Sequence, residues 1–138
     1  MKNHLLILLC STALLTACSK AGDVNDAAED KLEHDARASA ASAGSAVAAL
    51  GLSEAQLLEA DLLGPDHKEL GDVAGVVRDA NGKVDRLLVE IEGSDPDRYV
   101  HVPIADLATV QQGNDIDLAT MMTKQQLAAL PEVPLPRP

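Results

Sequence analysis

The sequence predicts a mainly β protein, a small antiparallel barrel or sandwich that ends in a short helix. Between residues 57 and 118, short apolar runs recur at roughly ten-residue spacing and are separated by turn residues. No stretch between these runs is long enough for a long helix. The chain has no Trp, no Phe and a single Tyr, so the core must consist of Leu, Val, Ile and Ala.

Residues 1–17 have the features of an export signal. A basic start precedes the apolar stretch LLILLCSTALL (5–15), which is shorter than the roughly 20 apolar residues of a spanning helix. The next segment, LTAC (15–18), resembles the lipoprotein box of bacterial lipoproteins, in which the Cys is lipidated and becomes the first residue of the mature chain. The resemblance implies a lipid anchor on Cys18. Since Ser19 follows instead of Asp, it also implies the periplasmic face of the outer membrane.

An ordinary secretory signal, cleaved after the small residues Thr16 and Ala17, is the alternative interpretation. On either interpretation Cys10 is removed with the signal. The mature chain therefore has no pair of cysteines for a disulfide, although its compartment would permit one.

The charge of the chain limits its partners. Removal of residues 1–17 takes away Lys2 and no acid, so the net charge changes from -11 to -12, with 10 basic against 22 acidic residues. This acidity repels phosphate backbones and anionic headgroups, and we expect no nucleic-acid partner. The lack of aromatic side chains disfavours a carbohydrate or nucleotide site.

Residues 18–52 form a segment rich in Ala, Ser and acidic residues, with few large apolar side chains. This composition predicts a disordered or partly helical tether, with no packed structure before about Leu50. Treated as a flexible coil, such a tether would hold the next domain about 30 Å from the bilayer.

Residues 53–131 form the predicted domain. Its first apolar run (57–63) is followed by the turn GPDHKE. The next two runs (70–79 and 84–93) flank Asn81-Gly82, which predicts a hairpin with a type I′ turn.

Alternation within these runs predicts which residues are buried. Leu87, Val89 and Ile91 share one face of their strand, and Val100 and Val102 share a face of RYVHVP (98–103), which ends at Pro103.

The last elements are a second hairpin and a helix. LATV (107–110) and DIDL (115–118) are split by QQGN. In TKQQLAAL (123–130), Thr123 and Gln126 predict a capping box, and the helix should stop before Pro131.

Three segments of this domain together resemble the PRC-barrel family. They are ADLLGPDHKELGDVAGVVRDANGKVDRLLVEIEG (60–93), RYVHVPIADL (98–107) and TKQQLAALP (123–131), with Gly71 before the second strand, a hairpin at 79–83 and a V-x-V-P segment at 100–103. The resemblance spans roughly residues 57–131. The resemblance implies a small barrel that serves as a scaffold or docking module. A Pro-rich tail (132–138) follows.

The side chains with reactive chemistry form no predicted metal site. His34, His67 and His101 fall in different segments and are interpreted as surface residues. The acidic segments DANGKVD (79–85) and GNDID (113–117) resemble calcium loops without their full spacing, so turn formation explains them.

No catalytic set emerges either, and we expect neither enzymatic activity nor a cofactor. Ser53 is interpreted as a helix cap, Ser94 lies in an acidic loop, and Cys18 is lipidated in the main interpretation. A small-ligand or cation-binding envelope protein remains the alternative function, and an enzyme with an unrecognised site is a further one.

The leading hypothesis is a membrane-anchored periplasmic lipoprotein that presents a docking module to an unknown protein partner or to a second copy of itself. We expect RYVHVP to be an edge strand, which can pair with another chain. Arg98, Tyr99 and His101 are the candidate partner-binding residues, since Tyr and Arg are enriched among residues that contribute most to binding. The alternative is that Tyr99 caps one end of the aliphatic core.

Overall fold

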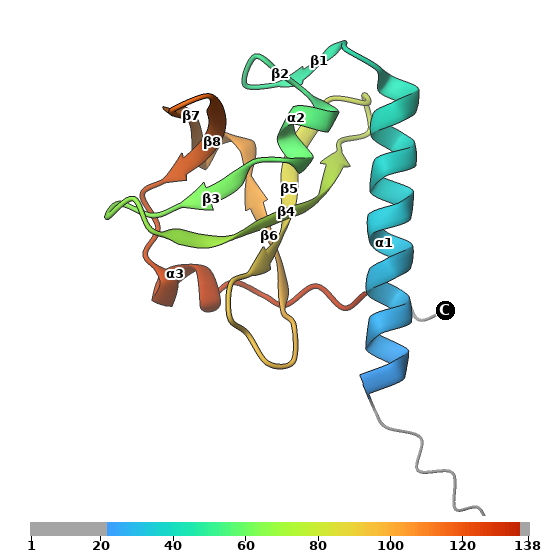
Figure 1. Cartoon of the computed structure of the whole chain (residues 1–138), viewed down its shortest axis with the longest axis vertical. Coiled ribbons are helices and arrows are strands. Elements are labelled where there is room, and N and C mark those ends of the chain that lie inside the picture. Colours follow the sequence, from blue (N-terminus) through green and yellow to red (C-terminus); the bar gives the residue numbers. More distant parts are fainter. Residues whose placement is uncertain (1–21, 136–138) are drawn as a thin grey trace, which may run out of the picture.

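A computed structural model describes residues 22–135, and these residues confirm a mainly β protein with a short C-terminal helix. The signal peptide and Cys18 lie outside the described residues. The elements in chain order are α1 (Gly22–Ala43), β1 (Val47–Ala49), β2 (Leu52–Ser53), α2 (Glu54–Leu58), β3 (Asp61–Leu63), β4 (Glu69–Arg78), β5 (Val84–Ile91), β6 (Tyr99–Pro103), the 3₁₀ turn η1 (Ile104–Asp106), β7 (Leu107–Gln112), β8 (Asp115–Thr120) and α3 (Lys124–Ala128) (Figure 1).

The main sheet has six strands in the order β6-β5-β4-β3-β8-β7. Every neighbouring pair is antiparallel except β3 and β8, which are parallel. The prediction of a wholly antiparallel barrel is therefore corrected in two respects: one strand pair is parallel, and the first and last strands of the sheet do not pair to close a barrel. The β7–β8 hairpin pairs through β8 with the free side of β3, and β6 and β7 remain at the two ends of the sheet.

The hairpin between β4 and β5 is confirmed, but its turn is not of type I′. Gly82 has a positive φ of 79°, whereas Asn81 does not share it. The Asp79 carboxylate accepts hydrogen bonds from the amides of Asn81 (2.8 Å) and Lys83 (3.0 Å). These bonds close a longer loop in which only Gly82 is left-handed, as in a type I turn followed by a bulge. Leu50 and Gly51, which join β1 to β2, both have positive φ.

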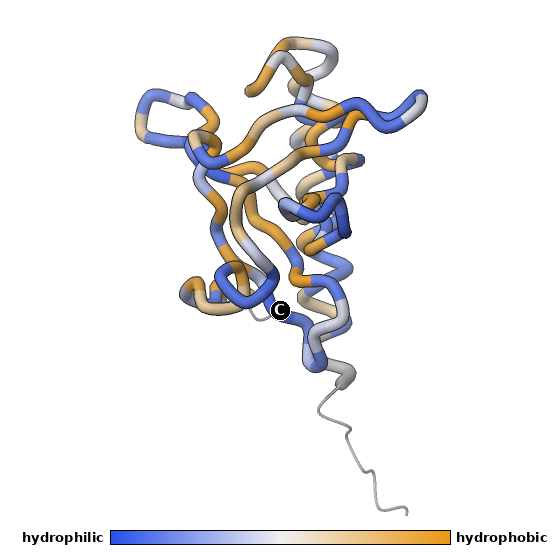
Figure 2. Tube along the Cα trace, turned by 90° about the vertical axis from the view of Figure 1, so that its left-hand side faces the viewer, coloured by the Kyte–Doolittle hydropathy of each residue, from blue (hydrophilic) through white to orange (hydrophobic). Residues whose placement is uncertain are grey.

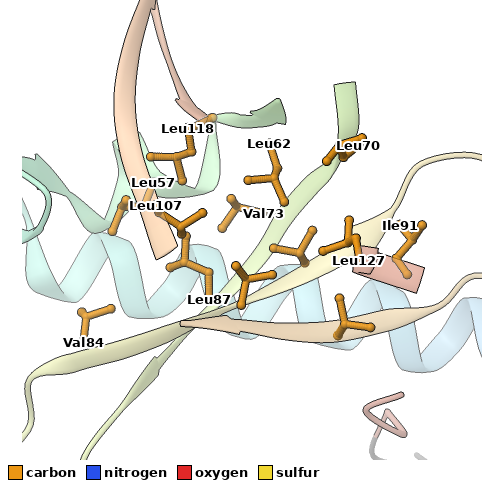
Figure 3. Close-up of a cluster of buried hydrophobic side chains, with 14 of the residues drawn as sticks. Leu57, Leu62, Leu70, Val73, Val84, Leu87, Ile91, Leu107, Leu118 and Leu127 are labelled. Atoms are coloured by element: carbon orange, nitrogen blue, oxygen red, sulfur yellow. The ribbon is translucent and has the colours of Figure 1, made fainter. Parts of the chain in front are cut away.

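The core lies on one face of the sheet and is aliphatic, as predicted. Figure 3 shows the side chains of β3, β4, β5 and β8 converging with those of α2 and α3. Its fully enclosed members include Leu57, Leu62, Leu87, Val89, Val100, Val102, Leu118 and Leu127. Each such side chain contributes about 1.5–3 kcal/mol on burial. In Figure 2 the apolar strand segments are separated by hydrophilic turns at the periphery.

Residues 22–43 of the predicted tether form the long helix α1 (Figure 1), in line with the helical one of the two predicted alternatives. The expectation of no packed structure before about Leu50 is wrong, because this helix packs against the domain. The helix lies against the sheet face opposite the core, and its stripe of Ala28, Leu32, Ala36 and Ala40 recurs every four residues. Ala28 and Ala40 are only 5% and 6% exposed. Because small side chains allow close approach, a stripe with little hydrophobicity is enough to dock the helix.

Both predicted helix caps are confirmed. Ser53 and Gln56 form a capping box at the start of α2, and Thr123 and Gln126 form one at the start of α3. Each box satisfies two backbone amides that the helix leaves free. The helix α3 ends before Pro131, as expected.

The short helix α2 is tied to the sheet by an ion pair. Its buried Glu54 accepts a hydrogen bond of 2.6 Å from Nη2 of Arg78, at the end of β4. The contact links residues 24 positions apart and compensates the burial of the Glu54 charge.

Candidate functional site

The strand β6, predicted as a docking edge, does lie at one end of the sheet. Its Tyr99, however, is only 2% exposed. The ring lines a crevice between α1 and the sheet, and its hydroxyl donates a hydrogen bond of 3.1 Å to Oε2 of Glu90. Burial, reinforced by the Glu90 charge, raises the pKa of Tyr99, so the phenol stays neutral. Tyr99 is thus buried and offers no surface to a partner, but it lies beneath α1 on the face opposite the aliphatic core and does not cap one end of that core.

The free side of β6 is partly covered by the chain's own C-terminal segment. The amide of Val133 donates to the Tyr99 carbonyl at 2.7 Å, and Val100 bridges to Glu132. Arg98 donates two hydrogen bonds of 3.2 Å, one to Glu132 of this segment and one to the Ala128 carbonyl at the end of α3. Arg98 therefore has an intramolecular role, and a covered edge is blunted against pairing with other chains.

His101, the third predicted residue, lies half-buried on β6 opposite Leu88. Burial lowers its pKa below the usual 6.5, and the nearby Arg86 lowers it further. His101 is therefore neutral at pH 7. The structure does not gather it with His34 or His67, which are both exposed.

The opposite end of the sheet is formed by β7, which has no strand on its outer side within residues 22–135. Apart from Leu107, the β7 side chains are exposed or half-exposed. Because its outer backbone groups are unpaired, β7 offers the template for strand addition that we predicted for β6.

An apolar groove of about 730 Å³ lies beside β7, and we refer to it as the methionine groove. Its walls come from β7, β8, the turn after β3, η1, the loop after β8 and α3. They include Pro65, Leu107, Ala108, Ala119, Met121 and Met122. Met121 is 84% exposed, the largest value among the large hydrophobic residues of the described part of the chain.

No pattern in the sequence predicts this groove as a whole. Its one local signal is the pair Met121-Met122 directly after an apolar strand, since flexible Met side chains are common at adaptable binding surfaces. The other walls come from segments up to about sixty positions apart and become neighbours only when β8 pairs with β3.

A second feature is a concentration of carboxylates on the sheet face opposite the core. Glu29 of α1 meets Glu90 and Asp97 there, with carboxylate oxygens within 4.8 Å of one another. Burial raises the pKa of Glu29 and of Glu90, and neighbouring acids raise both further. The same face of β3 and β4 carries Asp61 and Asp72.

The serines considered for catalysis have structural partners. The Ser53 side chain caps α2. The Ser94 hydroxyl donates to the Ile91 carbonyl at 2.8 Å and accepts from the Arg98 amide at 2.9 Å. These hydrogen bonds order the loop between β5 and β6. The expectation that the protein is not an enzyme stays a prediction.

Comparisons with known proteins identify no protein-family model that matches the chain and no similar curated protein. The PRC-barrel resemblance therefore stays a prediction. Within residues 22–135, no helix is both long and apolar enough to cross a membrane. The lipid anchor predicted at Cys18 lies outside the described residues.

Proposed function

We propose that this protein is a lipoprotein of the bacterial cell envelope, anchored through Cys18, whose PRC-barrel-like domain binds an extended segment of a partner protein along β7 and the methionine groove. The observation that carries the proposal is the contrast between the two ends of the sheet. The β6 end is covered by residues 132–133, whereas β7 is open and adjoins an apolar groove.

The expected binding mode is strand addition, in which main-chain hydrogen bonds supply affinity and side-chain pockets supply specificity. An added strand on β7 would place alternate side chains toward the groove, so we infer apolar residues at those positions. The chain has a net charge of -11, and basic residues elsewhere in the partner would speed the encounter.

The packed helix α1 changes the geometry of the proposed anchor. Since α1 begins at Gly22, four residues after Cys18, even a fully extended connection spans at most about 14 Å. The domain is therefore held close to the membrane. A flexible coil of residues 18–52 would instead have separated the domain from the bilayer by about 30 Å. The strands β7 and β8 and the helix α3, which contribute to the walls of the methionine groove, lie away from α1 (Figure 1).

The anchor is tested by Cys18→Ala. We expect the variant to remain as an unprocessed precursor or to lose stable membrane attachment, because each buried methylene of an acyl chain contributes about 0.8 kcal/mol. Membrane fractionation, with lipid labelling of the wild-type protein, provides the measurement. Lipid-free wild-type protein would contradict the anchor.

The docking surface is tested by a photo-crosslinking side chain placed at position 121 in cells. We expect one discrete adduct, identified by mass spectrometry, because Met121 projects from the groove. Position 47 is the matched control, since Val47 is also a strongly exposed hydrophobic residue (71%) but lies on β1. Met121→Glu should abolish a crosslink made from position 108, whereas Val47→Glu should not.

The adduct also distinguishes the partners considered above. An adduct of twice the chain's mass would identify a second copy of the protein as the occupant. Equal adducts from positions 121 and 47, or none from position 121, would contradict docking at the methionine groove.

A further inference from the structure

The helix α1 runs along the outside of the domain and is held there mainly by packing (Figure 1). Within residues 26–36, Ala28 is the one buried side chain, and Leu32 and Ala36 are half-buried. Among residues 26–135, the ion pairs of the helix connect its own residues, as in Lys31–Asp35 and Arg37–Glu33. No side-chain hydrogen bond in this part of the chain joins α1 to the sheet. Little therefore opposes a local release of its N-terminal part.

One contact between α1 and the rest of the domain is repulsive. The carboxylates of Glu29 on α1, Glu90 on β5 and Asp97 in the loop between β5 and β6 present oxygens within 4.8 Å of one another. Like charges at this separation repel, most strongly where burial reduces the screening by water. The Tyr99 hydroxyl, which donates to Glu90, offsets part of the cost. Glu29 is thus held on the domain against the charges that it faces.

The surroundings of Glu29 and Glu90 add further negative charge. Additional acids face them from α1 and from β4: Asp26, Asp30, Glu33 and Asp72. Among the described residues that line the crevice beneath α1, Arg37 is the one basic residue, and it is paired with Glu33 at 2.8 Å. Burial raises the pKa of both carboxyls, and the neighbouring acids raise it further. The docked helix therefore binds these protons more tightly than a released helix would.

We propose that residues 22–36 of α1 form an acid-sensitive strap, which docks on the sheet when the contact of Glu29 with Glu90 and Asp97 is protonated and releases more readily when it is ionised. Docking is strongest below the ordinary Glu value of 4.5 and weakens as the pH rises through the raised pKa values. Residues 37–43 stay in place because Ala40 is buried and the chain continues into β1.

The consequence of release rests on the anchor in the proposed function. Since α1 begins four residues after Cys18, the docked strap keeps the domain close to the membrane. Release of residues 22–36 would free up to about 50 Å of extended chain between the lipid and the domain. The strap would therefore control how far β7 and the methionine groove reach from the membrane toward a partner.

Hydrogen exchange of the mature protein, read as protection factors at about pH 5 and about pH 7.5, tests the strap. The amides of residues 26–36 should be less protected than those of β4 and β5 at the higher pH, because they open locally. Their protection should fall between the lower and the higher pH, by up to about tenfold for each unit by which a pKa is raised. Equal protection of α1 and the two strands, or protection in α1 that does not fall, would overturn the proposal.

Two variants with the same loss of charge show whether Glu29 is responsible. Glu29→Gln removes the acid in the contact, whereas Asp30→Asn removes an exposed acid from the same turn. At the higher pH, Glu29→Gln should restore most of the protection that residues 26–36 have at the lower pH, and Asp30→Asn should change it much less. Equal effects of the two would contradict the strap. Hydrogen exchange in α1 does not depend on a lipid at Cys18, so the strap and the anchor can fail separately.

Discussion

Gly71 lies where the backbones of β4 and β5 approach each other closely. A Cβ atom at this position would be 1.9 Å from the Glu90 carbonyl oxygen of the neighbouring strand. No rotamer change can relieve such a contact, because the obstacle is main chain. A glycine in the interior of a strand often marks a close backbone approach of this kind.

We expect Gly71→Ala to destabilise the domain by about 1–3 kcal/mol, since β4 and β5 must separate to admit the methyl group. Gly75→Ala is the matched control in the same strand, where the new Cβ would meet only the Leu88 side chain at 3.7 Å. Urea unfolding of both variants provides the measurement. Equal midpoints for the two would show that the strands relax around Gly71 without cost.

At the scale of elements, the helix α1 buries a face of β5 that the alternation of apolar residues predicts to be exposed. The core face of β5 is predicted correctly by Leu87, Val89 and Ile91, but Leu88 on the other face is buried as well. A strand with both faces buried loses the alternation that a half-exposed strand shows. Because α1 covers the second face, it belongs to the domain and lies N-terminal to the boundary expected at residue 53.

The docking of α1 can be tested with one carboxylate at two adjacent positions. Ala40→Asp puts a charge into the contact, whereas Ala41→Asp puts it on the exposed side of the same turn. Only Ala40→Asp should detach the end of the helix and destabilise the domain, because a buried charge without a partner is costly. The fluorescence of Tyr99, the one aromatic residue, reports whether α1 still covers the sheet. Identical unfolding curves for both variants would contradict a packed helix.

At the scale of the whole molecule, the net charge of -11 is concentrated in part on one face of the sheet. Burial raises the pKa of Glu90 in the folded protein, and the charges of Glu29, Asp97 and Asp72 raise it further, against a lowering by the Tyr99 hydrogen bond. The folded state therefore binds this proton more tightly than the unfolded state does. Folding becomes more favourable as the pH falls toward the ordinary value of 4.5.

We expect the urea midpoint to rise between pH 7 and about pH 5, because Glu29, Asp61 and Glu69 have raised pKa values in the same direction. Glu90→Gln should raise the midpoint at pH 7 and reduce its dependence on pH. The exposed Glu59→Gln is the control with the same loss of charge. A midpoint that falls steadily on acidification would contradict this account.

At still lower pH the trend should reverse. Asp79 has a pKa below the usual 3.8 because the amides of Lys83 and Asn81 donate to its carboxylate. The pKa values of Asp66 and Asp35 are also lowered, because the side chains of Lys68 and Lys31 donate hydrogen bonds to them. Protonation of these groups removes stabilising hydrogen bonds, so stability is lost as the pH falls through their folded pKa values.

The sequence by itself determined the elements whose signals are local. The capping boxes at Ser53 and Thr123, the hairpin around Asn81-Gly82 and the core faces of β5 and β6 follow from side chains within a few positions of one another. Such signals act through backbone geometry and period-two alternation, which do not depend on the rest of the fold.

Only the tertiary structure decided which surfaces are covered. The Ala stripe of α1 has too little hydrophobicity to predict docking, and Tyr99 is buried because that helix lies over it. The parallel pairing of β3 with β8 assembles the methionine groove and brings Asp117 beside Asp61, across more than fifty residues of chain. These contacts join segments that are distant in the sequence, and their energy depends on how closely whole elements approach one another. A local pattern of residues cannot predict that approach.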